Sequence, residues 1–294
     1  MASFQQSKPE TDSQMDPLIS PEDLSHLTHD RSGVIVDARS GQDARERYGR
    51  GHLDGALHVH LEEELSDIQE DLRIGGRHPL PPPERFGSLL GKLGIEAATH
   101  VVVYDDQSGA SAAARFWWML RAAGHERVQV LDGGFRAALT TGFPESTETP
   151  VPRAKPPYPV TSWQLPTLSM EEVADYVKDP RYVLIDVRDE SRYKGIEEPI
   201  DTIAGHIPGA INLPYAHNLG PEGFFLPAEE LRRMYQPVIA GRPASRIIFH
   251  CGSGVTACHT LLAFAHAGME IPAIYTGSWS EWSRNGKPLA REKT

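Results

Sequence analysis

One cysteine of this chain stands in a glycine-containing turn between an apolar run and a helical pattern. The turn has the sequence Cys251-Gly252-Ser253-Gly254-Val255-Thr256. Glycine lets the backbone curl so that its N–H groups face inward, and the N-terminus of the following helix adds partial positive charge. A ring of amides of this kind stabilises an anion, and a thiolate held in it is a reactive nucleophile. We therefore expect Cys251 to carry out covalent chemistry.

The second cysteine, Cys258, predicts no chemistry of its own. It lies on an apolar helical segment, where free cysteine is usually buried and inert. A disulfide between Cys251 and Cys258 would close only a small loop, so we expect reduced thiols and a reducing compartment. His250 and His259 flank the two cysteines, but their spacing does not match the short CxxC pairs of zinc sites, and we expect no metal.

The sequence repeats itself once. Five segments of the first half recur in the second half, in the same order and at a nearly constant distance. The matching pairs are residues 34–39 and 183–188, 51–56 and 205–210, 101–103 and 247–249, 123–124 and 267–268, and 131–135 and 275–279. Ordered internal similarity indicates two copies of one domain. Residues 147–166 between them are rich in proline, which predicts an extended connector.

Within each copy, short apolar runs alternate with helical segments. Residues 183–187 and 247–249 have the pattern of buried strands, and residues 112–122 and 257–267 have that of helices. The alternation predicts an α/β fold in which each domain is a mainly parallel sheet flanked by helices. Cys251 would then lie at the carboxyl edge of the second sheet, where functional groups of such folds gather. We expect its sulfur to be exposed to a cleft between the two halves of the chain.

The domain organisation follows from the repeat and the connector. We expect a flexible tail at residues 1–16, a first, non-catalytic domain at 17–146, the proline-rich linker at 147–166 and a second, catalytic domain at 167–294.

Together these motifs resemble the rhodanese-like sulfurtransferases. The resemblance spans residues 17–289 and rests on the repeat, the connector, the loop at Cys251, and the segments Gly205-His206-Ile207-Pro208-Gly209-Ala210 and Gly277-Ser278-Trp279-Ser280-Glu281-Trp282. The Cys-Gly-Ser-Gly-Val-Thr loop is similar to that of the 3-mercaptopyruvate sulfurtransferases, whereas relatives that prefer thiosulfate usually have Cys-Arg-Lys-Gly-Val-Thr. The resemblance implies two tandem rhodanese-like domains.

The resemblance also implies a mechanism. The Cys251 thiolate attacks the sulfur of a small anionic donor and becomes a persulfide, from which an acceptor removes the outer sulfur. The loop residues Gly252, Gly254, Val255 and Thr256 would hold the anionic sulfur and the donor. The acceptor is a thiol such as thioredoxin or glutathione, or cyanide, and no cofactor is implied.

An arginine of the second copy is implied to bind the donor. Arg192 matches the family arginine that holds the anionic group, to which a guanidinium offers two parallel hydrogen bonds. The family often has a second arginine shortly afterwards, but residues 197–201 contain none. We expect Arg77, from the first copy, to replace it across the domain interface.

The first copy has no cysteine in residues 104–111, which correspond to the catalytic loop, so it is expected to be a scaffold. Two of its residues are implied to reach the site. His78 matches a family histidine near the substrate. Glu62 stands where a proton relay with Cys251 and Ser253 usually has an aspartate. An ordinary role at the interface is the alternative for both, because exposed Glu and His are common.

Four residues that occur in both copies predict structural roles, since only one copy is catalytic. We expect Arg39 and Arg188, which follow the strands, to pair with carboxylates, and His52 and His206 to hold a turn.

Composition excludes several classes of function. The chain of 294 residues has 40 acidic and 29 basic side chains and a formal net charge of −11. An acidic surface repels phosphates, so we expect no nucleic-acid partner. No apolar run approaches the roughly 18 residues that span a membrane, and the first residues lack the pattern of a secretory signal. We expect a cytoplasmic protein.

Several functions remain as alternatives. The uncharged loop favours 3-mercaptopyruvate, a singly charged donor, over the thiosulfate dianion, which is the second choice. A sulfur-relay protein would pass the persulfide to a partner protein. A cysteine phosphatase is disfavoured, because the position of its phosphate-binding arginine is Ala257 here. A non-catalytic module is disfavoured by the intact cysteine loop.

Overall fold

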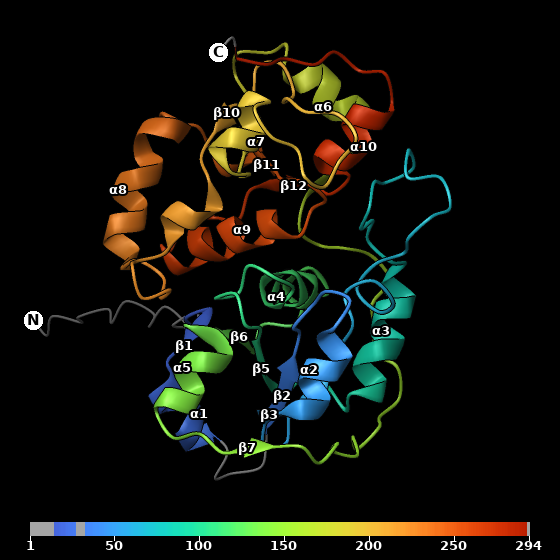
Figure 1. The fold of residues 1–294 in the computed structure, drawn as a ribbon, viewed down its shortest axis with the longest axis vertical. Helices are drawn as coiled ribbons and strands as arrows, with labels where there is room; N and C mark the ends of the chain where they lie inside the picture. The colour runs from blue at the N-terminus through green and yellow to red at the C-terminus, as the bar shows by residue number, and fades with distance from the viewer. Residues whose placement is uncertain (1–14, 28–32, 293–294) are drawn as a thin grey trace, which may run out of the picture.

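The computed structural model describes residues 15–27 and 33–292 of the chain. These residues form two α/β lobes, one from each copy of the repeat, stacked on one another (Figure 1). The tail expected at residues 1–16 lies outside the described residues except for Met15 and Asp16. We propose residues 17–146 and 167–294 as the two domains and 147–166 as their linker.

The first lobe contains a five-stranded sheet with the order β1-β6-β5-β2-β4, in which all neighbours are parallel. Its strands are β1 (Leu18–Ile19), β2 (Gly33–Asp37), β4 (Leu57–His58), β5 (His100–Tyr104) and β6 (Val128–Leu131). Its helices are α1 (Pro21–Leu27), α2 (Ala44–Arg50), α3 (Pro83–Lys92), α4 (Ala113–Ala122) and α5 (Gly134–Thr140). A separate antiparallel pair joins β3 (His52–Leu53) to β7 (Glu145–Ser146).

The second lobe repeats this arrangement with the order β10-β9-β11-β12-β8, again all parallel. Its strands are β8 (Thr167–Leu168), β9 (Val183–Asp186), β10 (Ile211–Asn212), β11 (Ile247–His250) and β12 (Ala273–Tyr275). Its α-helices are α6 (Met170–Tyr176), α7 (Glu190–Lys194), α8 (Ala228–Ile239), α9 (Thr256–His266) and α10 (Ser278–Arg284), and its 3-10 helices are η2 (Tyr215–Asn218) and η3 (Ala244–Arg246).

These elements confirm the α/β fold with two tandem domains that the sequence predicts. The strands expected at 183–187 and 247–249 are β9 and β11, and the helices expected at 112–122 and 257–267 are α4 and α9. All residues of the central strands β5 and β11 are buried, which explains their unbroken apolar runs. In the part of the chain that is described, no helix is long and apolar enough to cross a membrane.

An arginine–aspartate pair stabilises the same turn in both lobes. Arg39 donates to the two carboxylate oxygens of Asp37 at 3.1 and 2.6 Å. Arg188 donates to those of Asp186 at 3.1 and 2.7 Å. Each arginine also donates to a glycine carbonyl of the turn that follows, at 2.7 Å. All four side chains are buried, so the structural role predicted for both arginines is confirmed.

The repeated histidines hold a turn in the same way. The ring of His52 stacks on Tyr48, and that of His206 stacks on Tyr193, each with 3.9 Å between ring centroids. Each Nδ1 forms a hydrogen bond with the backbone carbonyl of the same tyrosine, at 2.9 and 2.8 Å. The structural role predicted for both histidines is therefore confirmed.

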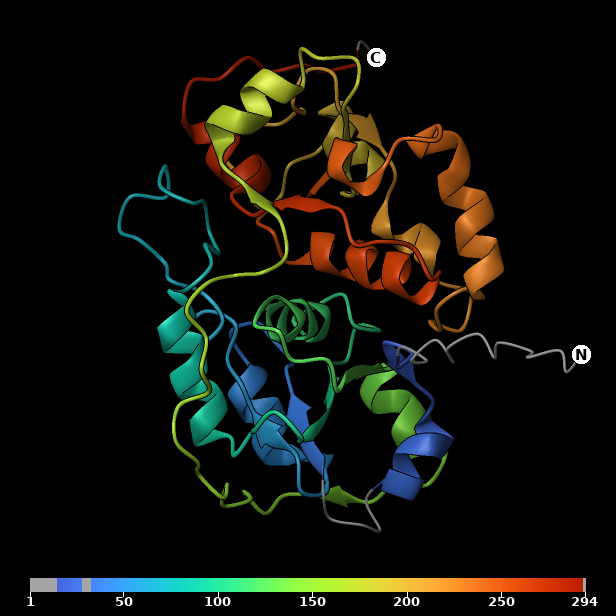
Figure 2. The ribbon, with the colours of Figure 1, turned by 180° about the vertical axis from the view of Figure 1, so that it is seen from behind.

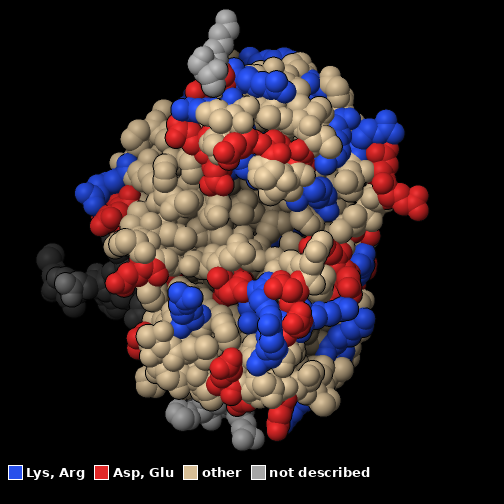
Figure 3. Space-filling view, viewed as in Figure 1, with Lys and Arg blue, Asp and Glu red and all other residues tan. Residues whose placement is uncertain are grey.

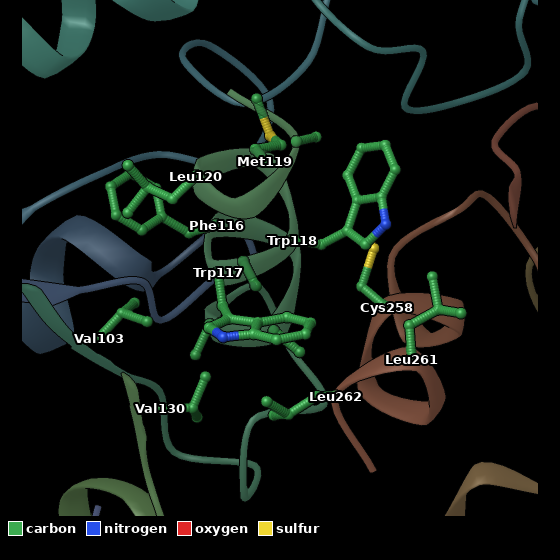
Figure 4. Packing of buried hydrophobic residues seen from close by; sticks show 14 of the residues in the cluster. Val103, Phe116, Trp117, Trp118, Met119, Leu120, Val130, Cys258, Leu261 and Leu262 are labelled. Carbon is green, nitrogen blue, oxygen red and sulfur yellow. The ribbon is translucent and has the colours of Figure 1, made fainter. Parts of the chain in front are cut away.

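The lobes meet where α4 faces α9 (Figures 1 and 2). The side chains of the two helices belong to one buried hydrophobic cluster (Figure 4), which includes Phe116, Trp117, Trp118, Met119, Cys258, Leu261 and Leu262. Burial raises the pKa of the Cys258 thiol to about 12, so this thiol stays protonated at neutral pH. Cys258 thus has the structural role predicted for it, and the interface is continuous with the cores of both lobes.

The proline-rich connector lies along α3 (Figure 2). The N–H groups of Tyr158 and Lys155 donate to the carbonyls of Gly87 and Gly91 at 2.9 and 2.8 Å. A Cβ atom at Gly87 would clash with the carbonyl oxygen of Tyr158, and one at Gly91 would lie 2.7 Å from that of Pro156. Glycine on this face of α3 therefore permits the close approach of the connector.

We predict that Gly87→Ala lowers the free energy of unfolding by about 1–2 kcal/mol, because the added methyl group displaces the connector. Gly49→Ala in α2 is the matched control, since a Cβ there has no neighbour within 4 Å. It should leave stability unchanged or raise it by up to about 1 kcal/mol through helix propensity. Urea unfolding measures both changes, and a Gly87→Ala variant as stable as the wild type would contradict the close packing.

Candidate functional site

The loop that begins at Cys251 leaves the carboxyl end of β11, as predicted, and leads into α9. It is fixed to the start of α10: the Cys251 N–H donates to Ser278 Oγ at 3.1 Å, and the Cys251 carbonyl accepts from the Trp279 N–H at 3.0 Å. The Gly254 N–H donates to the Cys251 sulfur at 3.2 Å. The loop thus directs at least one backbone donor at the sulfur.

Glycine is required at position 254. Its φ is +75°, and a Cβ atom would lie 2.5 Å from the carbonyl oxygen of Thr276. Val255 and Thr256 complete the turn, with Thr256 as the first residue of α9. The predicted loop residues therefore stand together, and Gly254 is the one whose N–H reaches the sulfur.

The first lobe has an aspartate where the second has its cysteine. Asp105 follows Tyr104, which pairs with Asp37 across the sheet, as Cys251 follows His250, which pairs with Asp186. The Asp105 carboxylate accepts backbone N–H groups at 2.8 to 3.1 Å, from Gln107, Gly109, Ser111 and Ala113. Burial raises the pKa of Asp105, and these amides oppose the rise. The same loop architecture thus surrounds an acidic group in the first lobe.

Cys251 itself is 1% exposed. We expected a sulfur open to a cleft between the two halves, and this expectation is wrong for the structure as it stands. The surface is hollowed between the lobes (Figure 3), but Cys251 belongs to the buried hydrophobic cluster that both lobes share. A small molecule can therefore reach the sulfur only when neighbouring groups move.

A histidine of the first lobe contacts the loop. His78 Nδ1 lies 2.8 Å from Ser253 Oγ. Burial lowers the pKa of His78 to about 3, and the charges of Arg77 and Arg115 contribute to the shift. His78 is therefore a neutral imidazole at physiological pH, in hydrogen-bond contact with the serine.

Glu62 lies near the other ring nitrogen of His78. Its Oε1 is 4.0 Å from His78 Nε2, and its Oε2 is 3.2 Å from His60 Nδ1. In the structure His78 thus lies between Ser253 and Glu62, whereas the relay expected from the sequence linked Ser253 directly to Glu62. A proton relay that includes Glu62 stays a hypothesis, and in this geometry it would pass through His78.

Two arginines, one from each lobe, converge on Gly252. A Cβ atom built on Gly252 would lie 3.1 Å from Arg77 Nη2 and 3.5 Å from both Nη atoms of Arg192. The structure thus brings Arg77 beside Arg192, in the place where the sequence lacks a second arginine. Any side chain at position 252 would obstruct the space that the two guanidinium groups share.

Carboxylates hold both guanidinium groups from behind. Glu198 accepts from Arg192 Nε and Nη2 at 3.2 and 2.7 Å. Asp201 accepts from Arg77 Nε at 3.3 Å and from Arg284 at 2.7 Å. Because each Nε is held by a carboxylate, each guanidinium keeps Nη hydrogens for a ligand at Gly252.

Two charged residues of this region, Asp105 and Arg115, were not predicted from the sequence. Arg115 lies on α4, is fully buried, and donates to the backbone carbonyls of Gly254 and His78. One signal was available: Arg115 is the one charge between Ala112 and Leu120, in a run that is otherwise apolar. A lone cation in such a run points to a buried partner.

Comparison with known proteins identifies the architecture. The family model described as rhodanese-like domain matches the chain twice, at residues 20–140 and 169–285. A probable 3-mercaptopyruvate sulfurtransferase of Pseudomonas aeruginosa is 41% identical over 244 residues, which are 80% of this chain and 82% of the relative. The thiosulfate sulfurtransferase of Mus musculus is 38% identical over 257 residues, 85% of this chain and 83% of the relative.

A solved structure agrees with these matches. The 3-mercaptopyruvate sulfurtransferase from Leishmania major superposes with a TM-score of 0.79 at 30% identity, over 94% of this chain and 76% of that one. The similarity covers both lobes and the connector, so it extends to the whole arrangement and not to one domain alone.

We predict that His78 makes stability fall in mild acid. Its pKa of about 3 in the folded protein lies below the ordinary value of 6.5, so the unfolded chain binds the extra proton between these limits. The contribution of the neutral His78 ring to the free energy of unfolding is fully present above pH 6.5 and is lost as the pH falls towards 3. In His78→Asn, the free energy of unfolding should decline by about 1–2 kcal/mol less between pH 6.5 and 5.

Urea unfolding at each pH measures this difference. His217→Asn is the control, because His217 is exposed, and it should follow the wild type. If His78→Asn showed the full wild-type decline, the neutral state of His78 would be refuted.

Proposed function

We propose that this chain, a sulfurtransferase that belongs to the rhodanese-like domain family, carries sulfur as a persulfide on Cys251 and takes it from 3-mercaptopyruvate. The observation that carries the proposal is the convergence of three groups on one loop. The Gly254 N–H lies 3.2 Å from the sulfur, and two guanidinium groups flank Gly252.

The reaction has two steps. The Cys251 thiolate attacks the thiol sulfur of the donor, an S–S bond forms, and the bond between that sulfur and carbon breaks. Pyruvate leaves as its enolate and takes up a proton. In the second step an acceptor thiolate or cyanide attacks the outer sulfur, the S–S bond breaks, and the Cys251 thiolate is restored.

The proposed reaction needs the sulfur as an anion in both steps, as thiolate and as persulfide. The inward N–H of Gly254 and the positive end of α9 would stabilise each form. The corresponding loop of the first lobe, with Asp105 in its ring of amides, supports this capacity, since four N–H groups there surround one acidic group.

Charge around Gly252 supports a singly charged donor. Arg192 and Arg77 face the site, but Glu198 and Asp201 stand behind them, so the net positive charge is small. A monocarboxylate such as 3-mercaptopyruvate matches this balance better than a dianion. Thiosulfate sulfurtransferase activity is the second candidate, because two guanidinium groups can also hold a sulfonate oxygen each.

Ser253 and His78 would supply the proton that the leaving enolate takes up. The Ser253 hydroxyl lies between the sulfur loop and the neutral His78 ring, which suits the transfer of a proton to the leaving enolate. Because Cys251 is 1% exposed, the donor would enter when Arg77 and His78 shift. Both belong to a first-lobe segment that contains Gly75 and Gly76, each with φ near +75°.

For the second step we propose a thiol acceptor, such as thioredoxin or glutathione, or cyanide. A cytoplasmic location fits this, because both cysteines are free and one must stay reduced to work. Turnover with dithiothreitol, cyanide and thioredoxin, measured side by side, distinguishes a small-molecule enzyme from a sulfur-relay protein.

We predict that Cys251→Ser lowers turnover about a thousandfold or more with either donor, because the nucleophile is lost. Mass spectrometry after donor treatment should show one added sulfur on Cys251 of the wild type and none on the variant. Cys258→Ala is the control and should still gain sulfur at Cys251. A Cys251→Ser variant with full turnover would refute the assignment of the nucleophile.

We predict that Arg77→Ala raises KM for 3-mercaptopyruvate about tenfold or more, because a charge-assisted hydrogen bond to the donor is lost. Arg73→Ala is the matched control: Arg73 belongs to the same segment, but it is exposed and pairs with Asp71. Steady-state kinetics give both values. An unchanged KM in Arg77→Ala would exclude this arginine from donor binding.

A further inference from the structure

Arg115 is a buried cation that the reaction scheme above does not use. It lies on α4 of the first lobe, among the aromatic side chains that pack against α9, and its exposed fraction is 0%. Burial of a guanidinium among apolar groups is unfavourable unless a partner compensates for its charge. The buried guanidinium of Arg115 therefore needs a partner that balances its charge.

The guanidinium group connects two parts of the candidate site. Its Nη1 donates to the carbonyl of Gly254 at 3.0 Å, and its Nη2 donates to the carbonyl of His78 at 3.2 Å. Gly254 is the residue whose N–H contacts the Cys251 sulfur, and His78 is the residue whose ring contacts Ser253. One side chain of the first lobe thus fixes both polar contacts of the loop.

The charge of Arg115 has no carboxylate partner. Among residues 15–27 and 33–292 no Asp or Glu forms an ion pair with it, and its Nε has no hydrogen-bond acceptor. Burial lowers the pKa of Arg115, and the groups whose negative charge opposes this are the sulfurs of Cys258 and Cys251. Since the pKa of Cys258 is about 12, that thiol is uncharged at neutral pH. Of these two sulfurs, the one that the proposed reaction turns into an anion is that of Cys251.

Each of the other arginines near the loop pairs with at least one carboxylate, and Asp201 also pairs with Arg284. Asp186 and Glu198 pair with Arg188, Glu198 also pairs with Arg192, and Asp201 pairs with Arg77. Three further neighbours are neutral at physiological pH: burial lowers the pKa of His250 and His78 and raises that of Tyr215. The carboxylate of Glu62 lies 4.0 Å from His78 Nε2. Arg115 therefore differs from the other arginines near the loop in that no carboxylate of the described residues pairs with it.

We propose that Arg115 is a positioning residue that acts on Cys251 from the other lobe: it holds Gly254 and His78 in place and supplies the buried positive charge that balances the anionic sulfur. The proposal rests on Cys251 as the sulfur carrier. Since thiolate and persulfide have the same charge, Arg115 serves both steps of the cycle without moving.

The test measures how the reactivity of Cys251 depends on pH. Wild type, Arg115→Gln, Arg115→Lys and Arg121→Gln are alkylated with iodoacetamide between pH 5 and 10. Fragment-ion spectra must locate the label, because the tryptic peptide of residues 247–284 contains both cysteines. Arg121→Gln is the matched control: Arg121 also lies on α4, and it donates to the carbonyl of Glu126.

We expect Arg115→Gln to move the midpoint of the pH–rate profile upward by about one unit, which lowers the rate at neutral pH about tenfold. Arg115→Lys should keep the midpoint within a few tenths of a unit, because the charge remains. Its turnover should still fall about tenfold, since one ammonium group cannot hold two separated carbonyls with the geometry of a guanidinium. Arg121→Gln should match the wild type in both respects.

Three results would overturn the proposal. A folded Arg115→Gln variant with the wild-type midpoint would show that the charge has no effect on the sulfur. An equal shift in Arg115→Gln and Arg115→Lys would assign the effect to packing. Should Arg115→Gln not fold, Arg115→Lys decides alone: a retained midpoint with lower turnover supports the proposal, and any other result rejects it.

The same experiment separates this inference from the proposed function. If Cys251 of the wild type were neither alkylated nor able to gain sulfur, the proposed function would fail and this inference with it. If Cys251 reacted normally in the wild type and identically in Arg115→Gln, only the inference about Arg115 would fail.

Discussion

The contact between the Gly254 N–H and the Cys251 sulfur depends on a backbone conformation that a side chain would not permit. With φ at +75° and the carbonyl of Thr276 directly beside it, residue 254 has no room for a Cβ atom. The turn is therefore confined between α10 of its own lobe and Arg115 of the other. The shape of the sulfur site is consequently set by long-range neighbours as much as by the loop sequence.

The two lobes exchange contacts in both directions. The first lobe supplies Arg77, His78 and Arg115 to the loop at Cys251. The second lobe in turn contacts two loops of the first: His259 Nε2 lies 3.1 Å from the Ser108 carbonyl in the loop of Asp105, and the Phe225 N–H donates to Asp132 after β6 at 2.9 Å. This exchange gives the first lobe a role although it has no cysteine in the corresponding loop, because it supplies three polar side chains to the loop at Cys251.

The sequence predicted what local patterns encode. The repeated strands, the helix after the cysteine and the arginine–aspartate turns follow from periodicity and duplication, and the structure has them in place. It did not reveal that Glu198 and Asp201 hold Arg192 and Arg77, because those contacts are formed by tertiary packing. The burial of Cys251 was mispredicted for the same reason, since burial also depends on tertiary packing.

Asp105 limits how many of the two homologous loops can take up an outside anion. Its carboxylate already occupies the ring of amides in the first lobe, with four N–H donors directed at it. No outside anion can enter that ring without expelling a group that is covalently part of the chain. Although the molecule contains two homologous loops, the proposed reaction therefore has one loop, that of Cys251, in which to load a sulfur.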